Sequence, residues 1–221
     1  MSLLLYVRGG EELVMVTWLK RRLDAIRICV FLLPAVLVMA VACSPNTPMM
    51  HQSRQPDLTL EAFFEGETVA YGIFEDRYGN MKRQFRVNIT GVVNENTLIL
   101  DEDFLYDDGE TDKRVWVITN QGIQDDGSIR YQGEAADVIG VASGQIAGNA
   151  LNWVYDIDLE IGDSRLRVTF DDWIYQQDEN VAINRAYISK FGINIGSVTL
   201  VFLRGDLADL VYPLDLDNWP E

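Results

Sequence analysis

Apolar and polar side chains alternate along the chain with a period of two from about residue 60 onward. Between Met81 and Thr90, one face is mainly apolar and the other is polar, and similar alternation recurs in 98–107, 152–161 and 165–170. This period is typical of half-buried β-strands. No stretch after residue 60 keeps a good helical period over three turns. The sequence therefore predicts an all-β domain.

Turn-forming residues separate the alternating segments. Eight to ten strands with such short links are typical of an antiparallel sandwich or a closed barrel. We favour a closed or nearly closed barrel, because closure removes exposed sheet edges and an eight-stranded barrel can hold one small ligand. The turn signals are Tyr78-Gly79-Asn80, Asp107-Asp108-Gly109, Asp125-Asp126-Gly127 and Gly162-Asp163-Ser164.

The N-terminal region has the order of features found in a secretory signal peptide. A basic stretch from Lys20 to Arg27 precedes an apolar run of 14 residues, Ile28–Val41, and the small residues 40–42 lead to Cys43. The run is too short to span a bilayer as a helix, which needs roughly 20 residues. A cysteine in this position resembles the lipobox of bacterial lipoproteins, so we expect Cys43 to carry lipid. The alternative is a buried helix that happens to end in a cysteine.

The expected processing divides the chain into four parts. Glu11 and Glu12 precede the basic stretch, so a start at Met15 would give a more usual signal peptide. Ser44 is not the aspartate that retains enteric lipoproteins in the inner membrane, and by analogy we expect an outer-membrane lipoprotein that faces the periplasm. The parts are a signal peptide (1–42, with 1–14 a possible mis-assigned start), a lipidated cysteine and flexible tether (43–58), a β-barrel (59–205) and an acidic-apolar C-terminal tail (206–221).

The expected mature chain is strongly acidic. From residue 43 onward it has 13 Lys and Arg residues against 31 Asp and Glu residues, a net charge of −18. Phosphate groups of nucleic acids need cationic partners, so a nucleic-acid ligand is excluded. Cys29 would leave with the signal peptide and Cys43 would carry lipid, so the hydrophobic core must stabilise the domain without a disulfide.

Several kinds of active site lack the residues they need. The single histidine, His51, lies in the expected tether, so a Ser-His-Asp triad cannot form within the barrel. Zinc, copper and haem sites lack their usual His and Cys ligands there. The seven acids between Asp101 and Asp112 do not have the spacing of an EF-hand and suit a solvated turn. We therefore expect no metal and no cofactor.

Three charged residues fall on inward-facing positions of the expected strands: Arg83, Glu102 and Asp172. Buried charges are costly unless they are paired. They could form a buried salt bridge that fixes strand register, or a polar anchor in a ligand pocket. Asn184 and Arg185, with Lys190, could add donors at the same end. The tentative ligand-binding residues are Arg83, Phe85, Glu102, Phe104, Trp153, Tyr155 and Asp172, of which the aromatic residues would form the walls.

Several short motifs follow one another in a fixed order along the chain. They are Phe64-Glu65-Gly66, the segment 70–77, Glu102 to Glu110, Arg114-Val115-Trp116, Tyr131 to Gly140, Gly148 to Tyr155, Phe170 to Tyr175, Asn184-Arg185-Ala186 and Lys190-Phe191-Gly192. In these motifs, the chain resembles the bacterial lipoprotein family named domain of unknown function 3833 over roughly residues 57–204. The resemblance implies a lipocalin-like barrel and hints at lipid handling. No activity is established for the family, so it provides no functional residues.

Three functions remain compatible with the sequence. A binder of a lipid or other apolar molecule requires an open cavity lined with aromatic residues. A structural or assembly lipoprotein, which would bind a protein partner through its acidic surface, requires a filled barrel and an exposed patch such as Trp219 with the tail 206–221. A carboxylate-dependent hydrolase or isomerase requires two acids that converge in a cleft, one with a raised pKa. We favour the binder, and enzymatic activity is the less favoured reading.

Overall fold

The structure is a computed structural model that describes residues 46–161 and 164–219. The predicted signal peptide, the start at Met15 and the lipidated Cys43 lie outside the described residues. Three short helices are η1 (Pro48–His51), α2 (Leu60–Phe64) and α3 (Asp206–Asp209). The strands are β1 (Gly66–Asp76), β2 (Met81–Asn94), β3 (Thr97–Tyr106), β4 (Thr111–Ile123), β5 (Ile129–Glu134), β6 (Val138–Ala147), β7 (Ala150–Ile161), β8 (Ser164–Gln176), β9 (Val181–Lys190) and β10 (Ile193–Arg204).

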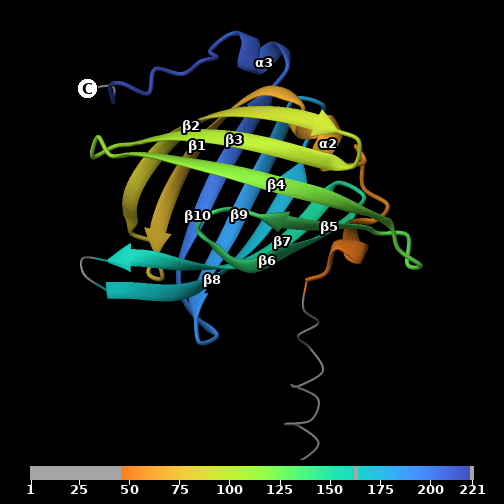
Figure 1. Ribbon diagram of the computed structural model, residues 1–221, viewed down its shortest axis with the longest axis horizontal. Coiled ribbons are helices and arrows are strands. Elements are labelled where there is room, and N and C mark those ends of the chain that lie inside the picture. Colours follow the sequence, from red (N-terminus) through yellow and green to blue (C-terminus); the bar gives the residue numbers. More distant parts are fainter. Residues whose placement is uncertain (1–45, 162–163, 220–221) are drawn as a thin grey trace, which may run out of the picture. The chain divides into compact units, whose positions relative to one another are not determined.

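The strands form a closed antiparallel barrel (Figure 1). Each strand pairs with the next one along the chain, and β1 also pairs with β10, which closes the sheet. The predicted all-β barrel is confirmed, and the ten strands of the described residues fall within the predicted number. Among the same residues, no helix is long and apolar enough to cross a membrane.

The alternation of side chains in the sequence sets which residues face the barrel interior. In β2, Phe85, Val87 and Ile89 are buried, whereas Thr90 on the opposite face is exposed. Successive side chains of a strand point to opposite faces, so the apolar set of each strand faces the core. The pairing of β7 with β8 continues in register through Trp153 and Asp172, which keeps Asp172 on the inner face.

Helix α2 packs at the end of the barrel where β1 begins and β2 ends. Thr59 caps this helix by accepting a hydrogen bond from the Ala62 backbone N–H, and Phe63 and Phe64 are almost fully buried. Phe64 meets Phe202 of β10 edge-to-face at a centroid distance of 5.3 Å. Gly91 permits this approach, since a Cβ there would lie 1.7 Å from the Phe64 carbonyl oxygen. We call this end the closed end.

The segment expected to be a flexible tether contacts the barrel at several points, although most of its described residues are exposed. Pro48 and Leu58 are buried, and η1 contacts β6 and β7. The Leu58 backbone N–H donates to the Gly148 carbonyl at 2.9 Å. Composition alone suggested a solvated linker, but these few apolar and backbone contacts are sufficient to place the segment.

The C-terminal segment also lies against the barrel. After α3, Leu214 is buried, and its backbone exchanges hydrogen bonds of 2.8 and 3.0 Å with the Asn88 side chain of β2. The guanidinium of Arg86 stacks over the ring of Trp219 at 5.0 Å. The predicted acidic-apolar tail therefore covers part of the outer surface of β2. All the buried core residues lie between Leu58 and Leu214, within the compact unit 47–221.

Candidate functional site

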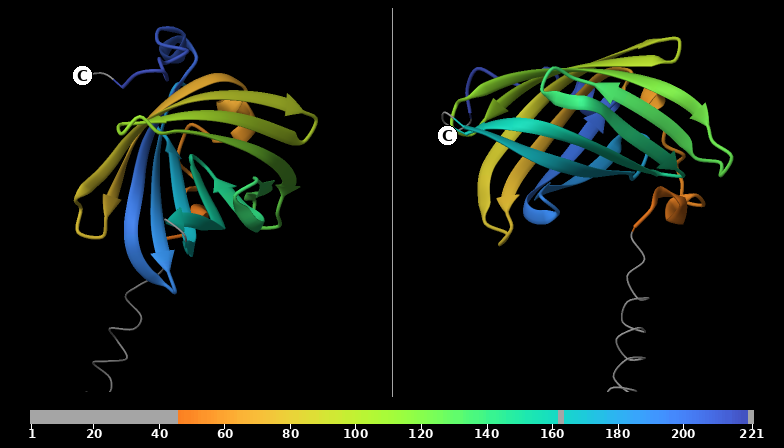
Figure 2. Two further views of the ribbon diagram at one scale, coloured as in Figure 1. Left: turned by 60° about the vertical axis from the view of Figure 1, so that its left-hand side comes forward. Right: turned by 60° about the horizontal axis from the view of Figure 1, so that its bottom comes forward.

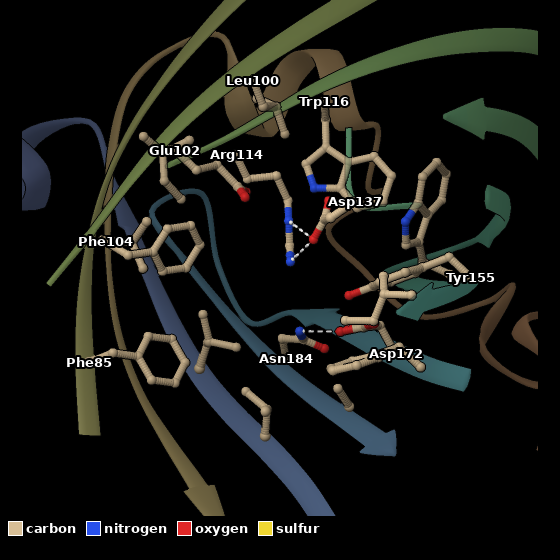
Figure 3. A pocket seen from close by; sticks show the side chains of 18 of the residues that line it. Phe85, Leu100, Glu102, Phe104, Arg114, Trp116, Asp137, Tyr155, Asp172 and Asn184 are labelled. Atoms are coloured by element: carbon tan, nitrogen blue, oxygen red, sulfur yellow. Dashed lines mark hydrogen bonds and ion pairs between the residues drawn. The ribbon is translucent and has the colours of Figure 1, made fainter. Parts of the chain in front are cut away.

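The barrel encloses a cavity of about 520 Å³ (Figure 3). Its lining begins at the closed end with Leu60 and Phe64, which are buried. It extends to Arg83, Asp112 and Asp158 at the opposite end, where the side chains are partly or largely exposed. The cavity therefore meets solvent at this second end, which we call the mouth.

All seven residues that the sequence singled out line this cavity. Phe85 and Phe104 lie together on one wall, with ring centroids 6.2 Å apart, and Tyr155 stacks on Phe170 at 5.2 Å on another. Aromatic walls of this kind suit an apolar ligand. The seven residues are Arg83, Phe85, Glu102, Phe104, Trp153, Tyr155 and Asp172.

An ion pair at the cavity wall joins Arg114 of β4 and Asp137, which precedes β6, and their side chains are 23% and 41% exposed. The Arg114 Nε and Nη2 atoms donate to one Asp137 oxygen at 3.1 and 2.5 Å. Burial opposes the charge on the Arg114 guanidinium, but Tyr155, Glu102 and Asp137 outweigh it and raise the pKa of Arg114. The guanidinium therefore provides a fixed positive charge in the cavity wall.

Asp172 and Asn184 form a second polar pair on β8 and β9 (Figure 3). The Asn184 Nδ2 donates to the Asp172 Oδ1 at 2.6 Å, and both residues are more than nine-tenths buried. Within the described residues, the Asp172 Oδ2 and the Asn184 Oδ1 have no hydrogen-bond partner. Burial raises the pKa of Asp172 to about 6, although Asn184, Arg114 and the Tyr155 side chain oppose the rise. Two acceptor atoms are thus left for a further donor.

Glu102 of β3 is the third acid of the cavity. It lines the cavity and is only partly exposed, so its carboxylate is poorly solvated. This burial raises the pKa of Glu102 to about 7, against the opposing effect of Arg114. Burial, followed by the charge of Asp172, also raises the pKa of Tyr155 well above its ordinary value. The site therefore contains two carboxyl groups that titrate near neutral pH.

Arg83 has different partners from those considered in the sequence analysis. It lies toward the mouth, where its Nη2 is 2.7 Å from an Asp108 oxygen and 2.5 Å from a Glu110 oxygen. Its guanidinium also lies 3.5 Å from the centroid of the Tyr106 ring. Arg114 instead provides the positive charge near Glu102 and Asp172, so Arg83 belongs to the mouth and not to the polar anchor.

Sequence reasoning missed Arg114 and Asp137 as site residues. Arg114 could have been found from the sequence, because Arg114, Trp116 and Ile118 occupy every second position of β4. All three line the cavity. Asp137 lies in a link between strands, where no periodicity indicates direction. Asn184, considered as an extra donor, does donate to Asp172, whereas Arg185 bonds to Thr199 and Ser197 of β10.

The polar side chains that line the cavity include carboxylates, guanidinium groups and one amide. Among the residues that the structure describes, no group of three His, Cys, Asp or Glu side chains could hold a metal ion. The polar side chains of the cavity offer a bound molecule hydrogen bonding to Asp172 and Asn184, charge interaction with Arg114, and proton exchange with Glu102 or Asp172.

Fold and site together define a closed antiparallel β-barrel with an internal ligand-sized cavity, the architecture used by lipocalins. The chain belongs to the family described as "Protein of unknown function (DUF3833)", whose model matches residues 37–204. This confirms the predicted family, and the match begins at residue 37 where we expected 57. No curated protein matches the chain.

Similarity to solved structures is remote. One of them is described as "Structure of S-type Phycobiliprotein Lyase CPES from Guillardia theta" and is 10% identical in sequence. The alignment covers 73% of this chain and 99% of the lyase chain, with a TM-score of 0.48.

Proposed function

We propose that the barrel binds one apolar small molecule that carries a hydrogen-bond donor. The observation that carries this proposal is the pair of buried acceptors, Asp172 Oδ2 and Asn184 Oδ1, at the wall of an otherwise largely apolar cavity and without a partner in the described residues. Leaving buried polar atoms unpaired costs on the order of 1–3 kcal/mol each, so a donor on the ligand would recover that free energy.

The size and the charge of the cavity narrow the class of ligand. A volume of about 520 Å³ falls within the range of roughly 300–1,000 Å³ that is usual for small-molecule sites. Among the described residues, five carboxyl groups line the cavity against two guanidinium groups: Glu102, Asp112, Asp137, Asp158 and Asp172 against Arg83 and Arg114. This excess of carboxyl groups favours a hydroxyl, amine or amide group on the ligand over a free carboxylate. A long-chain alcohol, amine or other neutral lipid has this chemistry.

Binding can be tested with the barrel unit, residues 46–221, which contains the complete hydrophobic core. Nile red reports entry into an apolar cavity, and a long-chain alcohol, a long-chain amine and a fatty acid of equal length are matched competitors. We expect uptake of Nile red and stronger displacement by the alcohol or the amine. If Nile red is not taken up, or if the fatty acid competes best, the proposal is overturned.

A pair of variants on one strand separates the cavity from the outer surface. Val198 of β10 lines the cavity, whereas Val201 lies on the outer face of the same strand and is 36% exposed. Val198→Phe should reduce Nile red uptake because the added ring fills the cavity, while Val201→Phe should leave uptake unchanged. Native mass spectrometry of the unit purified from its host then tests whether a natural ligand is retained.

A second candidate function is proton transfer on the bound molecule, as in an isomerase or hydrolase. Its support is that Glu102 and Asp172 titrate near neutral pH inside one cavity, as suits a general acid or base. The test is incubation of a total lipid extract of the host in D₂O with the protein, followed by mass spectrometry. Deuterium incorporation that requires Glu102 would support catalysis, and its absence would leave binding as the function.

The third function considered, binding of a protein partner through the acidic surface, has less support. It requires a filled barrel, whereas this barrel contains a cavity. The tail that was expected to form an exposed patch packs in part on β2, where Arg86 covers part of Trp219, while Leu207, Leu210 and Val211 stay 38%, 80% and 41% exposed.

We also propose that Cys43 is lipidated and holds the barrel in the cell envelope, at the outer membrane facing the periplasm. The support is the order of basic residues, apolar run, small residues and cysteine. Packing on the barrel begins at Pro48, so few residues would separate lipid and barrel. Metabolic labelling with an alkyne fatty acid should mark the full chain, and Cys43→Ser should abolish the label. Labelling that survives this substitution contradicts the proposal.

A further inference from the structure

We propose that two neighbouring hairpin tips beside the mouth dock on a bilayer that contains anionic lipids. We define the docking tips as two segments. Residues 77–82 link β1 to β2 and include the first two residues of β2, and residues 190–193 run from the last residue of β9 to the first residue of β10. This inference goes beyond ligand binding, and it does not require the cavity to be occupied.

The two docking tips lie on adjacent parts of the barrel. Because β1 pairs with β10, Asp76 at the end of β1 lies opposite Gly196 near the start of β10. In Figures 1 and 2, both tips project toward the same side of the barrel, the lower side of each view. One flat surface could therefore contact both tips at once.

Large apolar side chains are exposed at both tips. Phe191 is 92% exposed, Tyr78 73%, Ile193 63% and Met81 51%. Such residues contribute nothing to the core, and exposing them to water is unfavourable. Four of them on two adjacent tips form an apolar surface that would gain free energy on entering the headgroup region of a bilayer.

Phe191 is the most informative of these residues. Its φ of 52° lies in the left-handed region, which glycine and asparagine adopt readily and a bulky aromatic residue adopts rarely. The turn therefore favours another residue type. Burial of the Phe191 ring does not compensate for this, because the ring is exposed. Uncommon backbone conformations often mark functional positions.

The charge of the docking tips is opposite to that of the chain. They contain Arg77, Lys82 and Lys190 and no acid, while the whole chain has a net charge of −16. Arg77 lies 4.7 Å from the centroid of the Tyr78 ring, and the Lys190 ammonium lies 5.3 Å from that of Phe191. Aromatic rings beside basic groups are typical of membrane–water interfaces, and anionic lipids attract the bases.

Two acidic features lie near the docking tips and restrict how they could approach a membrane. Asp76 pairs with Lys82 at 3.1 Å, which weakens one of the positive charges. The acidic β3–β4 hairpin, with Asp107, Asp108 and Glu110, lies beyond β2 and projects in a different direction in Figure 1. Contact from the side of β1 and β10 therefore brings the basic residues to the lipid and keeps the acidic hairpin away from it.

The entry of the chain into the barrel lies at the other end. Helix η1 contacts β6 and β7, and the Leu58 backbone N–H donates to the Gly148 carbonyl in the turn between these strands, at the closed end. The docking tips lie at the end that carries the mouth. They therefore form a membrane contact that is separate from the proposed anchor on Cys43.

Sedimentation with vesicles tests the docking tips directly, using residues 46–221 so that no lipid anchor contributes. We expect binding to vesicles of phosphatidylethanolamine with phosphatidylglycerol, weaker binding to phosphatidylcholine, and weakening by added salt. Tyr78→Ser with Phe191→Asn should weaken binding at least about tenfold, because each ring loses its burial in lipid. Asn suits the backbone at position 191, so the barrel should remain folded, which circular dichroism checks.

The matched control replaces two exposed apolar residues elsewhere. Ile123 at the end of β4 and Leu210 after α3 are 76% and 80% exposed. Ile123→Ser with Leu210→Ser should leave vesicle binding unchanged. Lys82→Gln with Lys190→Gln should remove the preference for phosphatidylglycerol. Docking is overturned if the wild type does not bind anionic vesicles or if the control lowers binding as much as the tip variant. Nile red uptake without vesicles reports cavity binding separately.

Discussion

The Asn184 Nδ2 donates a 2.6 Å hydrogen bond to the Asp172 Oδ1 between neighbouring strands β8 and β9. This bond uses one polar atom of each residue. The remaining oxygen of each side chain is buried and, in the part of the chain that the structure describes, has no partner. The pair therefore combines a stabilising contact with an acceptor surface suited to a ligand.

Asp172→Asn should make the empty barrel more stable and bind its ligand less well. An amide at position 172 carries no charge to bury and can donate to the Asn184 Oδ1, which satisfies an acceptor. Near pH 8, where Asp172 is ionised, we expect a gain in the free energy of unfolding on the order of 2 kcal/mol. Urea denaturation measures the gain, and Nile red displacement by a long-chain alcohol measures the loss. A less stable variant with unchanged binding would contradict this prediction.

Glu102→Gln should reduce the pH dependence of stability. Burial raises the pKa of Glu102 from 4.5 to about 7, so the folded state binds more protons than the unfolded state between these values. Its contribution to stability is therefore complete below about pH 4.5 and is lost as the pH rises through about 7. Glutamine cannot ionise. The Tm of the variant relative to that of the wild type should therefore rise between pH 5 and pH 8.

The measurement for Glu102 is a series of thermal unfolding curves across that pH range. Groups whose pKa is lowered in the fold, such as Asp108 and Asp158, affect stability at lower pH and so do not interfere. The same curves for Glu61→Gln provide a comparison. Glu61 is a partly buried acid at the closed end, and it accepts a hydrogen bond from the Tyr131 hydroxyl at 2.7 Å. An equal change in Tm at both pH values for Glu102→Gln would show that its carboxyl is well solvated.

Gly91→Ala should destabilise the barrel through its closed end. The new Cβ would lie 1.7 Å from the Phe64 carbonyl oxygen, and backbone atoms cannot move aside as a flexible side chain can. We expect a loss of about 3 kcal/mol in the free energy of unfolding, at the upper end for overpacked cores. Val92→Ala, at the neighbouring position where the side chain is 50% exposed, is the control and should cost little. Comparable losses for the two variants would argue against tight packing of α2.

The sequence was sufficient to predict the barrel and much of its inner surface. The alternation of Phe85, Val87 and Ile89 in β2 identified inward-facing residues because a period of two directly reports the two faces of a strand. Glu102 was placed inside by the same reasoning. The packing of residues 48–58 and of α2 was missed, since these elements are too short to have a recognisable period.

The grouping of inward-facing charges could not be predicted in the same way. The alternation of apolar and polar residues shows that a side chain faces the interior. Which charged side chains come together depends on the pairing register of the strands around the whole barrel. Asp172 meets Asn184 because β8 and β9 are neighbours, whereas Glu102 and Arg114 come from β3 and β4. Position along the barrel axis then separates Arg83 at the mouth from Arg114 deeper inside.

Arg83→Met and Arg114→Met should therefore have unequal effects, although both arginines face the interior. Arg83 pairs with Asp108 and Glu110, whose side chains are 57% and 66% exposed, and solvent screens such pairs so that they contribute little to stability. Removing Arg114 leaves the poorly solvated Glu102 carboxylate in the cavity without its positive neighbour, which should cost about 3 kcal/mol at pH 8. That cost should shrink near pH 5, where Glu102 is protonated. Urea denaturation at both pH values measures the difference, and a larger loss for Arg83→Met would place the polar anchor at the mouth.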